Sequence, residues 1–138
     1  MDNSSKYTCA IIGLGRIGFS LGFDKLREQP ASHTMALKRN SKINIVAGCD
    51  INPENLYEWQ KYNKKASIYR NVDDLFKNIH ADIVTVAVNE ENHLPVAIKA
   101  IQTNPKLVIL EKPVALNTSD AFELQKVSEK FIGNNFNT

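Results

Sequence analysis

The sequence predicts an α/β domain built on a doubly wound parallel sheet, with helices covering both faces of the sheet. Short apolar runs alternate with longer amphipathic stretches along the whole chain, and the clearest run, residues 82–88, is rich in β-branched side chains. The runs are continuously apolar, as strands buried on both faces of a parallel sheet must be. Regular alternation of strands and helices favours right-handed crossovers between them.

Five strands and four amphipathic helices follow from this pattern. The strands are expected at residues 7–12, 43–49, 67–69, 82–88 and 107–110. The helices are expected at residues 53–64, 72–79, 91–103 and 118–131. Asn52 and Pro53 are strong signals for a helix start. Residues 28–42 make the first crossover unusually long, and we expect an extra turn or a second short helix after Pro30.

Composition describes one ordinary globular domain. The 138 residues are 43% hydrophobic and 23% charged, and the net charge of +2 lacks the dense basic stripe of nucleic-acid-binding domains. No apolar run reaches the ~20 residues that cross a bilayer. We therefore expect a cytoplasmic protein with neither nucleic-acid nor membrane partners. Cys9 and Cys49 lie in apolar runs without metal-ligand spacing, so we expect buried reduced thiols and no metal site.

A glycine motif follows the first strand. In Gly13-x-Gly15-x-x-Gly18, the first glycine permits a tight turn and the second lets a pyrophosphate approach the backbone. The third lets a following helix pack closely on the strand. We expect the turn to open that helix and the amides of Arg16 and Ile17 to point at the pyrophosphate. This motif in this context predicts a dinucleotide-binding Rossmann domain over residues 1–138.

An acidic residue after the second strand completes the motif. Asp50 lies farther from Gly13 than the typical ~20 residues, and the long first crossover accounts for the excess. Its carboxylate is expected to bond the ribose hydroxyls and to repel a 2′-phosphate. Ile51 follows, where an arginine would have favoured NADP, so we expect NAD rather than NADP. The alternative is that Asp50 only caps the next helix.

Two further polar segments follow the strands at 82–88 and 107–110. The first contains Val88, Asn89 and His93, and the second is Glu111-Lys112-Pro113. Ligands bind at the carboxyl ends of strands in open α/β sheets, which makes both segments candidates for the site. The residues alone equally allow an exposed loop with a surface ion pair at the second segment.

Four segments together resemble the Gfo/Idh/MocA oxidoreductase family. They are the glycine motif, Val-Ala-Gly-Cys-Asp50, His93, and Glu111-Lys-Pro-Val-Ala-Leu-Asn117. The resemblance implies hydride transfer between NAD(P) and a hydroxyl or carbonyl of sugars, cyclitols or sugar nucleotides. It also implies a second α/β domain, built on an open antiparallel sheet, that carries most of the substrate pocket. The chain is expected to end before that domain.

The resemblance implies roles for the polar segments. Lys112 matches a catalytic lysine beside the nicotinamide and the reacting hydroxyl, Pro113 shapes the nicotinamide pocket, and Glu111 lies near the nicotinamide ribose. His93 matches a family histidine, although the family often has Thr-Pro-Asn where this chain has Val88-Asn89-Glu90. A helix-start histidine satisfied by the backbone is the alternative for His93.

Two hypotheses about function remain open at this point. In the first, the chain is the cofactor domain of such a dehydrogenase. It is then inactive alone and binds a sugar-like substrate only together with a second domain. Alternatively, it is a non-catalytic NAD-binding module for sensing or interaction. An apolar docking face would favour a homo-oligomer. His33 could match a family histidine that follows the glycine turn, but we favour a surface-loop histidine.

Overall fold

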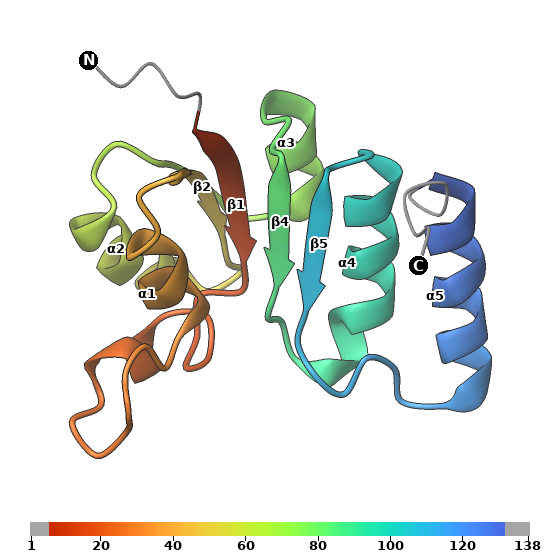
Figure 1. Cartoon of the computed structure of the whole chain (residues 1–138), viewed down its shortest axis with the longest axis horizontal. Coiled ribbons are helices and arrows are strands. Elements are labelled where there is room, and N and C mark those ends of the chain that lie inside the picture. Colours follow the sequence, from red (N-terminus) through yellow and green to blue (C-terminus); the bar gives the residue numbers. More distant parts are fainter. Residues whose placement is uncertain (1–5, 132–138) are drawn as a thin grey trace.

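A computed structural model describes residues 6–131 and contains one five-stranded sheet (Figure 1). The strand order is β3-β2-β1-β4-β5, and every neighbouring pair is parallel. The strands are β1 (Tyr7–Ile12), β2 (Ile43–Cys49), β3 (Ser67–Tyr69), β4 (Ile83–Val86) and β5 (Leu107–Leu110). This confirms the doubly wound sheet, although β4 is shorter than the predicted 82–88.

Helices cover both faces of the sheet. They are a 3₁₀ helix η1 (Ser20–Phe23), then α1 (His33–Lys38), α2 (Pro53–Tyr62), α3 (Val72–Asn78), α4 (Glu90–Gln102) and α5 (Thr118–Phe131). Helices α1 and α2 pack on one face through Leu37, Leu56 and Trp59. Helices α3 and α4 cover the other face, and α5 packs against α4 through Leu124 (Figure 1). None of the helices in residues 6–131 is long and apolar enough to span a membrane.

A register shift interrupts the pairing of β1 with β2 shortly before Gly48. Cys9 pairs with Ile45, whereas the next residue of β1, Ala10, pairs with Ala47. Gly48 then faces the fully buried ring of Trp59, whose atoms lie 2.5–2.8 Å from where a Cβ would stand. Glycine is therefore required at this position for the indole to pack against the sheet.

The glycine turn does not lead directly into an α-helix, contrary to the expectation that it opens one. The chain forms turns over residues 15–19 and the short η1. Residues 24–32 then form an irregular loop before α1 begins. On its return, the His33 N–H donates to the Ile17 carbonyl at 2.9 Å and the Thr34 N–H to the Gly18 carbonyl at 3.0 Å. Helix α1 therefore continues the turn begun at the glycines, and the inserted residues interrupt a single helix. A short helix, α1, does form within residues 28–42 and after Pro30.

Both cysteines are buried and unbonded, as predicted. Burial raises the pKa of Cys9 and of Cys49 to about 12, and the nearby Asp50 carboxylate adds to the effect at Cys49. Both thiols are thus protonated at neutral pH and act as small apolar side chains in the core.

Asp82 joins the amino ends of β1 and β4. Its Oδ2 accepts hydrogen bonds from the Thr8 N–H at 2.9 Å and from the Thr8 hydroxyl at 3.2 Å. The Thr8 N–H is the main cause that lowers the pKa of Asp82, helped by the hydroxyl and by Lys106. A carboxyl group with a lowered pKa stabilises the fold above its unfolded pKa, and this contribution is lost as pH falls through the folded pKa.

We therefore expect Asp82→Ala to reduce the free energy of unfolding by about 1 kcal/mol at neutral pH. The difference from wild type should shrink below about pH 4, where the unfolded carboxyl group titrates. Urea titrations across this range measure both effects. Thr8→Val keeps the Thr8 N–H bond but removes the hydroxyl, which also accepts from the Asp82 N–H at 3.0 Å, so part of its loss of stability should not depend on pH. A difference that stays constant across the range would contradict this role for Asp82.

Candidate functional site

A cavity of about 500 Å³ opens at the carboxyl ends of the strands, beside the junction of β1 and β4. The strand order reverses at this junction, because the chain passes from β1 outward to β3 and then returns to β4. Open α/β sheets bind their ligands at such a switch point. The cavity is lined by Ile12, Gly13, Gly15, Cys49, Asp50, Ile51, Asn71, Val72, Asp73, Ala87, Val88, Asn89, Asn92, Val96 and Lys99.

The three glycines of the motif have different surroundings. Gly13 has a φ of +92°, and a Cβ there would lie 2.5 Å from the Ala87 carbonyl. At Gly18 a Cβ would lie 1.9 Å from the Gly13 carbonyl oxygen, so the turn closes on itself at this point. A Cβ at Gly15 would meet nothing within 4 Å, since it would project into open space. The fold thus requires glycine at positions 13 and 18. At position 15 the absence of a side chain leaves the space in front of the turn open.

The turn presents unpaired backbone donors. The Gly13 N–H donates to the Cys49 carbonyl, which ties the turn to the end of β2. Within residues 6–131, the N–H groups of Gly15, Arg16, Ile17 and Gly18 have no acceptor. Unpaired amides in the first turn of a helix form a binding site for anions such as phosphate. The Arg16 and Ile17 amides are among these four, and their contact with a pyrophosphate stays a prediction.

Asp50 is held against the glycine turn. Its Oδ2 accepts from the Leu14 N–H at 2.8 Å and from Nδ2 of Asn55 at 3.2 Å, and its Oδ1 accepts from the Asn52 N–H at 2.8 Å. The cap of α2 is Asn52, whose own side chain accepts from the Glu54 N–H. Because a carboxylate offers about four acceptor sites, Asp50 keeps capacity for a further donor.

The outer wall of the cavity was missed by the sequence analysis. Asn71 and Asp73 come from the start of α3, and the Lys99 Nζ of α4 forms an ion pair with Asp73 Oδ1 at 2.9 Å. Asn71 follows β3 at the same edge of the sheet, so the rule about carboxyl ends could have found it. Lys99 lies in the last turn of a helix, and no local pattern marks it.

Of the two segments, the one after β4 contributes to the lining of the cavity and the one after β5 does not. Val88 and Asn89 line the cavity, whereas Glu111, Lys112 and Pro113 lie outside its lining, with Lys112 exposed. His93 is only 2% exposed, and its Nδ1 lies 2.7 Å from the Pro113 carbonyl oxygen, to which it donates. His93 therefore joins the start of α4 to the bend after β5. Within the described part of the chain, no group of His, Cys, Asp and Glu could hold a metal ion.

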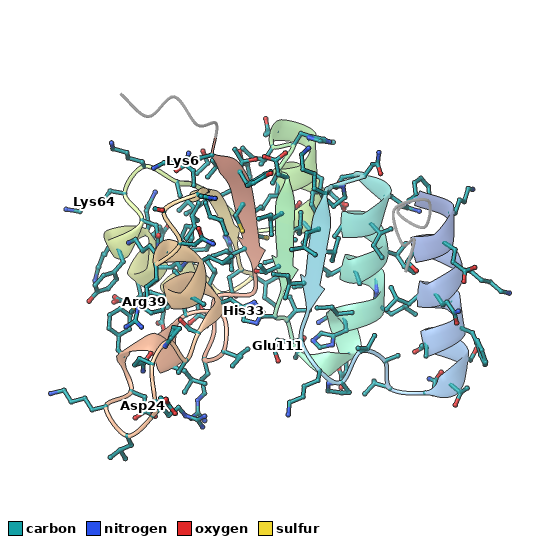
Figure 2. All side chains as sticks on the ribbon, viewed as in Figure 1. Lys6, Asp24, His33, Arg39, Lys64 and Glu111 are labelled. Atoms are coloured by element: carbon teal, nitrogen blue, oxygen red, sulfur yellow. The ribbon has the colours of Figure 1, made fainter. Side chains whose placement is uncertain are left out.

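The expectation that His33 lies in a surface loop is wrong. Its side chain is 11% exposed, and its Nε2 lies 2.7 Å from Oε1 of Glu111 (Figure 2). The sequence could not place it, because the insertion separates this histidine from the glycine turn that its helix continues.

The chain was compared with known proteins. The profile of the oxidoreductase family with an NAD-binding Rossmann fold, Gfo/Idh/MocA, matches residues 7–131. This chain belongs to the Gfo/Idh/MocA oxidoreductase family. Inositol 2-dehydrogenase from Salmonella typhimurium is 30% identical over 121 residues, which cover 87% of this chain and 32% of that protein. Glycosyl hydrolase family 109 protein 5 from Phocaeicola vulgatus is 35% identical over 94 residues, covering 62% and 18% of the two chains.

Solved structures of the family share the fold. The WlbA dehydrogenase from Chromobacterium violaceum, in complex with NADH and UDP-GlcNAcA, matches with a TM-score of 0.77 and 24% identity. The match covers 93% of this chain and 33% of that one. The myo-inositol 2-dehydrogenase from Lactobacillus plantarum matches with a TM-score of 0.73 and 26% identity, over 92% and 34% of the two chains. The chain thus spans about a third of the length of these dehydrogenases.

The cavity fits the NAD of a Gfo/Idh/MocA domain. The unpaired amides of the turn suit a pyrophosphate, and the open space above Gly15 leaves room for it. Asp50 offers a fixed acceptor for ribose hydroxyls at one end of the crevice. Apolar walls from Ile12, Val72 and Val96 suit a planar ring.

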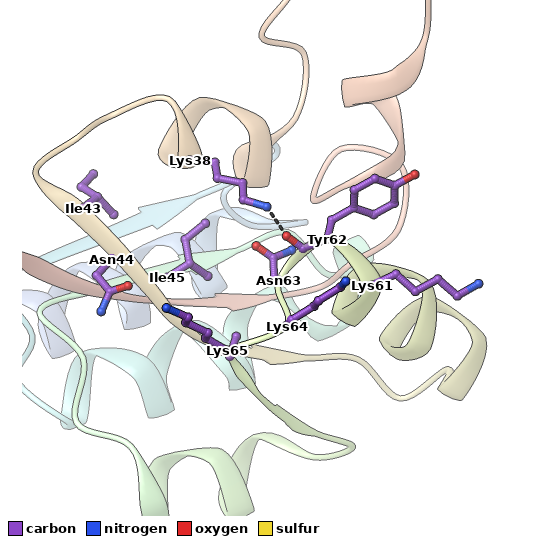
Figure 3. Close-up of a pocket in the computed structure, with 10 residues that line it drawn as sticks. Lys38, Ile43, Asn44, Ile45, Lys61, Tyr62, Asn63, Lys64 and Lys65 are labelled. Atoms are coloured by element: carbon purple, nitrogen blue, oxygen red, sulfur yellow. Dashed lines mark hydrogen bonds between the residues drawn. The ribbon is translucent and has the colours of Figure 1, made fainter.

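A second hollow, of about 510 Å³, lies beside the amino end of β2, away from the carboxyl ends of the strands (Figure 3). It is lined by Lys38, Ile43, Asn44, Ile45, Lys61, Tyr62, Asn63, Lys64, Lys65 and Ala66. Helices α1 and α2 end here, and Lys38 Nζ donates to the Tyr62 carbonyl. Basic side chains beside helix carboxyl ends satisfy free carbonyl groups, which explains Lys38 structurally. Open α/β sheets bind their ligands at the carboxyl ends of the strands, whereas this hollow lies beside the amino end of β2.

Proposed function

We propose that this chain is the cofactor half of an NAD-dependent dehydrogenase that moves hydride between the cofactor and a hydroxyl of a sugar, cyclitol or sugar nucleotide. The observation that carries the proposal is the cavity at the switch point, where Asp50 is held 2.8 Å from the Leu14 amide beside the open Gly15. Inositol dehydrogenases among its relatives support the substrate class.

The residues that would hold the cofactor lie along the crevice. The glycine-turn amides would bind the pyrophosphate, and Asp50 and Ile51 would bind the adenosine ribose beyond β2. Val88 and Asn89, which line the cavity on the side of β4 and β5, would contact the nicotinamide half. His93 supports the bend that carries the nicotinamide-side residues, through its hydrogen bond to the Pro113 carbonyl.

Lys112 carries the proposed chemistry of this half. NAD supplies a hydride acceptor when bound. Lys112 is exposed at the end of β5, so its Nζ can reach a substrate hydroxyl and hydrogen-bond its oxygen. Glu111 lies next to it, with its backbone fixed by a bond from its N–H to the Val86 carbonyl at 3.0 Å.

Substrate selection and turnover require a second domain in this proposal. Positioning contributes much of an enzyme's rate enhancement, so residues 1–138 alone should bind cofactor without useful turnover. Exposed apolar side chains on β5, on α5 and between them, Leu107, Val114, Leu116 and Phe122, support contact with such a domain.

Calorimetric titration with NADH and NADPH tests the proposal. Wild type should bind NADH, and NADPH at least roughly tenfold more weakly, because Asp50 repels a 2′-phosphate. Asp50→Ala should weaken NADH binding and reduce the preference. Glu58→Ala removes one negative charge from an exposed ion pair of α2 outside the cavity lining and should leave both affinities unchanged. Absence of NADH binding by wild type would refute the proposal, and a preference for NADPH would refute the role of Asp50.

A further inference from the structure

His33 and Glu111 form a contact between two segments that are far apart in the sequence. His33 begins α1, and Glu111 follows β5, so 78 positions separate the two residues whose side chains lie 2.7 Å apart (Figure 2). The imidazole is 11% exposed and the carboxylate 27%. An N–H donor on a carboxylate at this distance is a strong, charge-assisted hydrogen bond.

The position of His33 is fixed by the interrupted helix. Its N–H bonds the Ile17 carbonyl, as the N–H of the residue four places after Ile17 would in an uninterrupted α-helix. Thr34 fixes the next position, because its hydroxyl donates to the Gly18 carbonyl at 2.6 Å and accepts from Trp59 Nε1 at 3.0 Å. His33 is therefore a rigid part of the glycine turn, despite the irregular loop that precedes it.

Glu111 is held at both its backbone and its side chain. Its N–H donates to the Val86 carbonyl, and Oε1 meets His33. Within residues 6–131, Oε2 has no hydrogen-bond partner. The contact thus orients one carboxylate oxygen toward the glycine turn and leaves the other available at the edge where the nicotinamide half of the cofactor is proposed to lie.

We propose that His33 is a positioning residue for the nicotinamide half of the site, acting through Glu111. This inference rests on the proposed function. His33 Nε2 donates to Glu111 Oε1 and orients the carboxylate before the cofactor arrives, so less conformational freedom is lost on binding. The glycine turn that holds the pyrophosphate and the β5 end that meets the nicotinamide nucleoside are thereby held in one fixed relation.

Titrations with NADH and ADP test this role, because ADP keeps the adenosine and two phosphates but lacks the nicotinamide nucleoside. We expect His33→Ala to weaken NADH binding roughly tenfold and to change ADP binding less than about twofold. His33→Gln, whose amide Nε2 can donate to the same carboxylate, should restore most of the NADH affinity. In a Glu111→Ala background, His33→Ala should have no further effect on NADH affinity.

The outcomes separate this inference from the proposed function. If His33→Ala lost equal factors of affinity for NADH and for ADP, His33 would only support the glycine turn. This result would overturn the inference. An unchanged NADH affinity, or additive losses in the double variant, would overturn it as well. Failure of wild type to bind NADH would instead refute the proposed function. Thermal unfolding of each variant, with a melting temperature near that of wild type, shows that the affinities refer to folded protein.

Discussion

Replacing Gly15 with alanine should leave the fold intact and weaken NADH binding by ~30- to ~150-fold, or roughly 2–3 kcal/mol. A Cβ at this position meets no protein atom within 4 Å, so the substitution introduces no clash in the unliganded chain. The same Cβ would stand in the space in front of the unpaired amides, where the pyrophosphate must approach. The added methyl group thus costs hydrogen bonds to phosphate without costing packing.

Two measurements on Gly15→Ala separate these effects. Its melting temperature should stay within a degree or two of wild type, since surface substitutions are usually within about 0.5 kcal/mol. Calorimetry with NADH should show the loss of affinity. Ser20→Ala, a substitution at the exposed start of η1, is a control that should bind like wild type. Wild-type affinity in Gly15→Ala would mean that the phosphates do not approach this part of the turn.

Replacing Gly18 with alanine should, in contrast to Gly15→Ala, affect the stability of the fold and destabilise the domain by about 3 kcal/mol. Its Cβ would lie 1.9 Å from the Gly13 carbonyl oxygen and 3.3 Å from the Leu14 Cα. Both obstacles are backbone atoms, so no side-chain movement relieves the clash. The turn must open, which disturbs the bonds that the N–H and the hydroxyl of Thr34 make to the Gly18 carbonyl.

Urea or thermal unfolding of Gly18→Ala measures this cost. A loss of about 3 kcal/mol is a large part of the stability of a domain of this size, typically about 5–15 kcal/mol. Gly15→Ala is the matched control, because it places the same methyl group three residues earlier in the same turn. Equal stability of the two variants would contradict the closed geometry at Gly18.

The order of the elements could be predicted because each strand and helix carries its own local signal. The run at 107–110 and the cap at Asn52 are examples, and β5 and α2 form there. Strand β4 ends two residues before its apolar run does: Ala87 still donates to the Ile12 carbonyl, and Ala87 and Val88 line the cavity. Apolar composition alone does not mark that point.

The interrupted helix could not be predicted from local patterns. The glycine motif predicts a helix directly after the turn, and nothing nearby in the sequence shows that a helix would begin only at His33. That information lies in tertiary hydrogen bonds to Ile17 and Gly18. The pairing of His33 with Glu111 was missed for the same reason, as was Lys99 on the cavity wall.

The central claim is that NAD lies along the carboxyl edge of the sheet, from Asp50 to Glu111. An NMR titration of the ¹⁵N-labelled chain with NADH tests this most directly. Amide signals of residues 13–18, 50–51, 87–89 and 111 should shift with a common affinity, while residues 63–66 of the lysine-lined hollow should not. Shifts confined to that hollow, or no shifts with NADH present in excess, would contradict the claim.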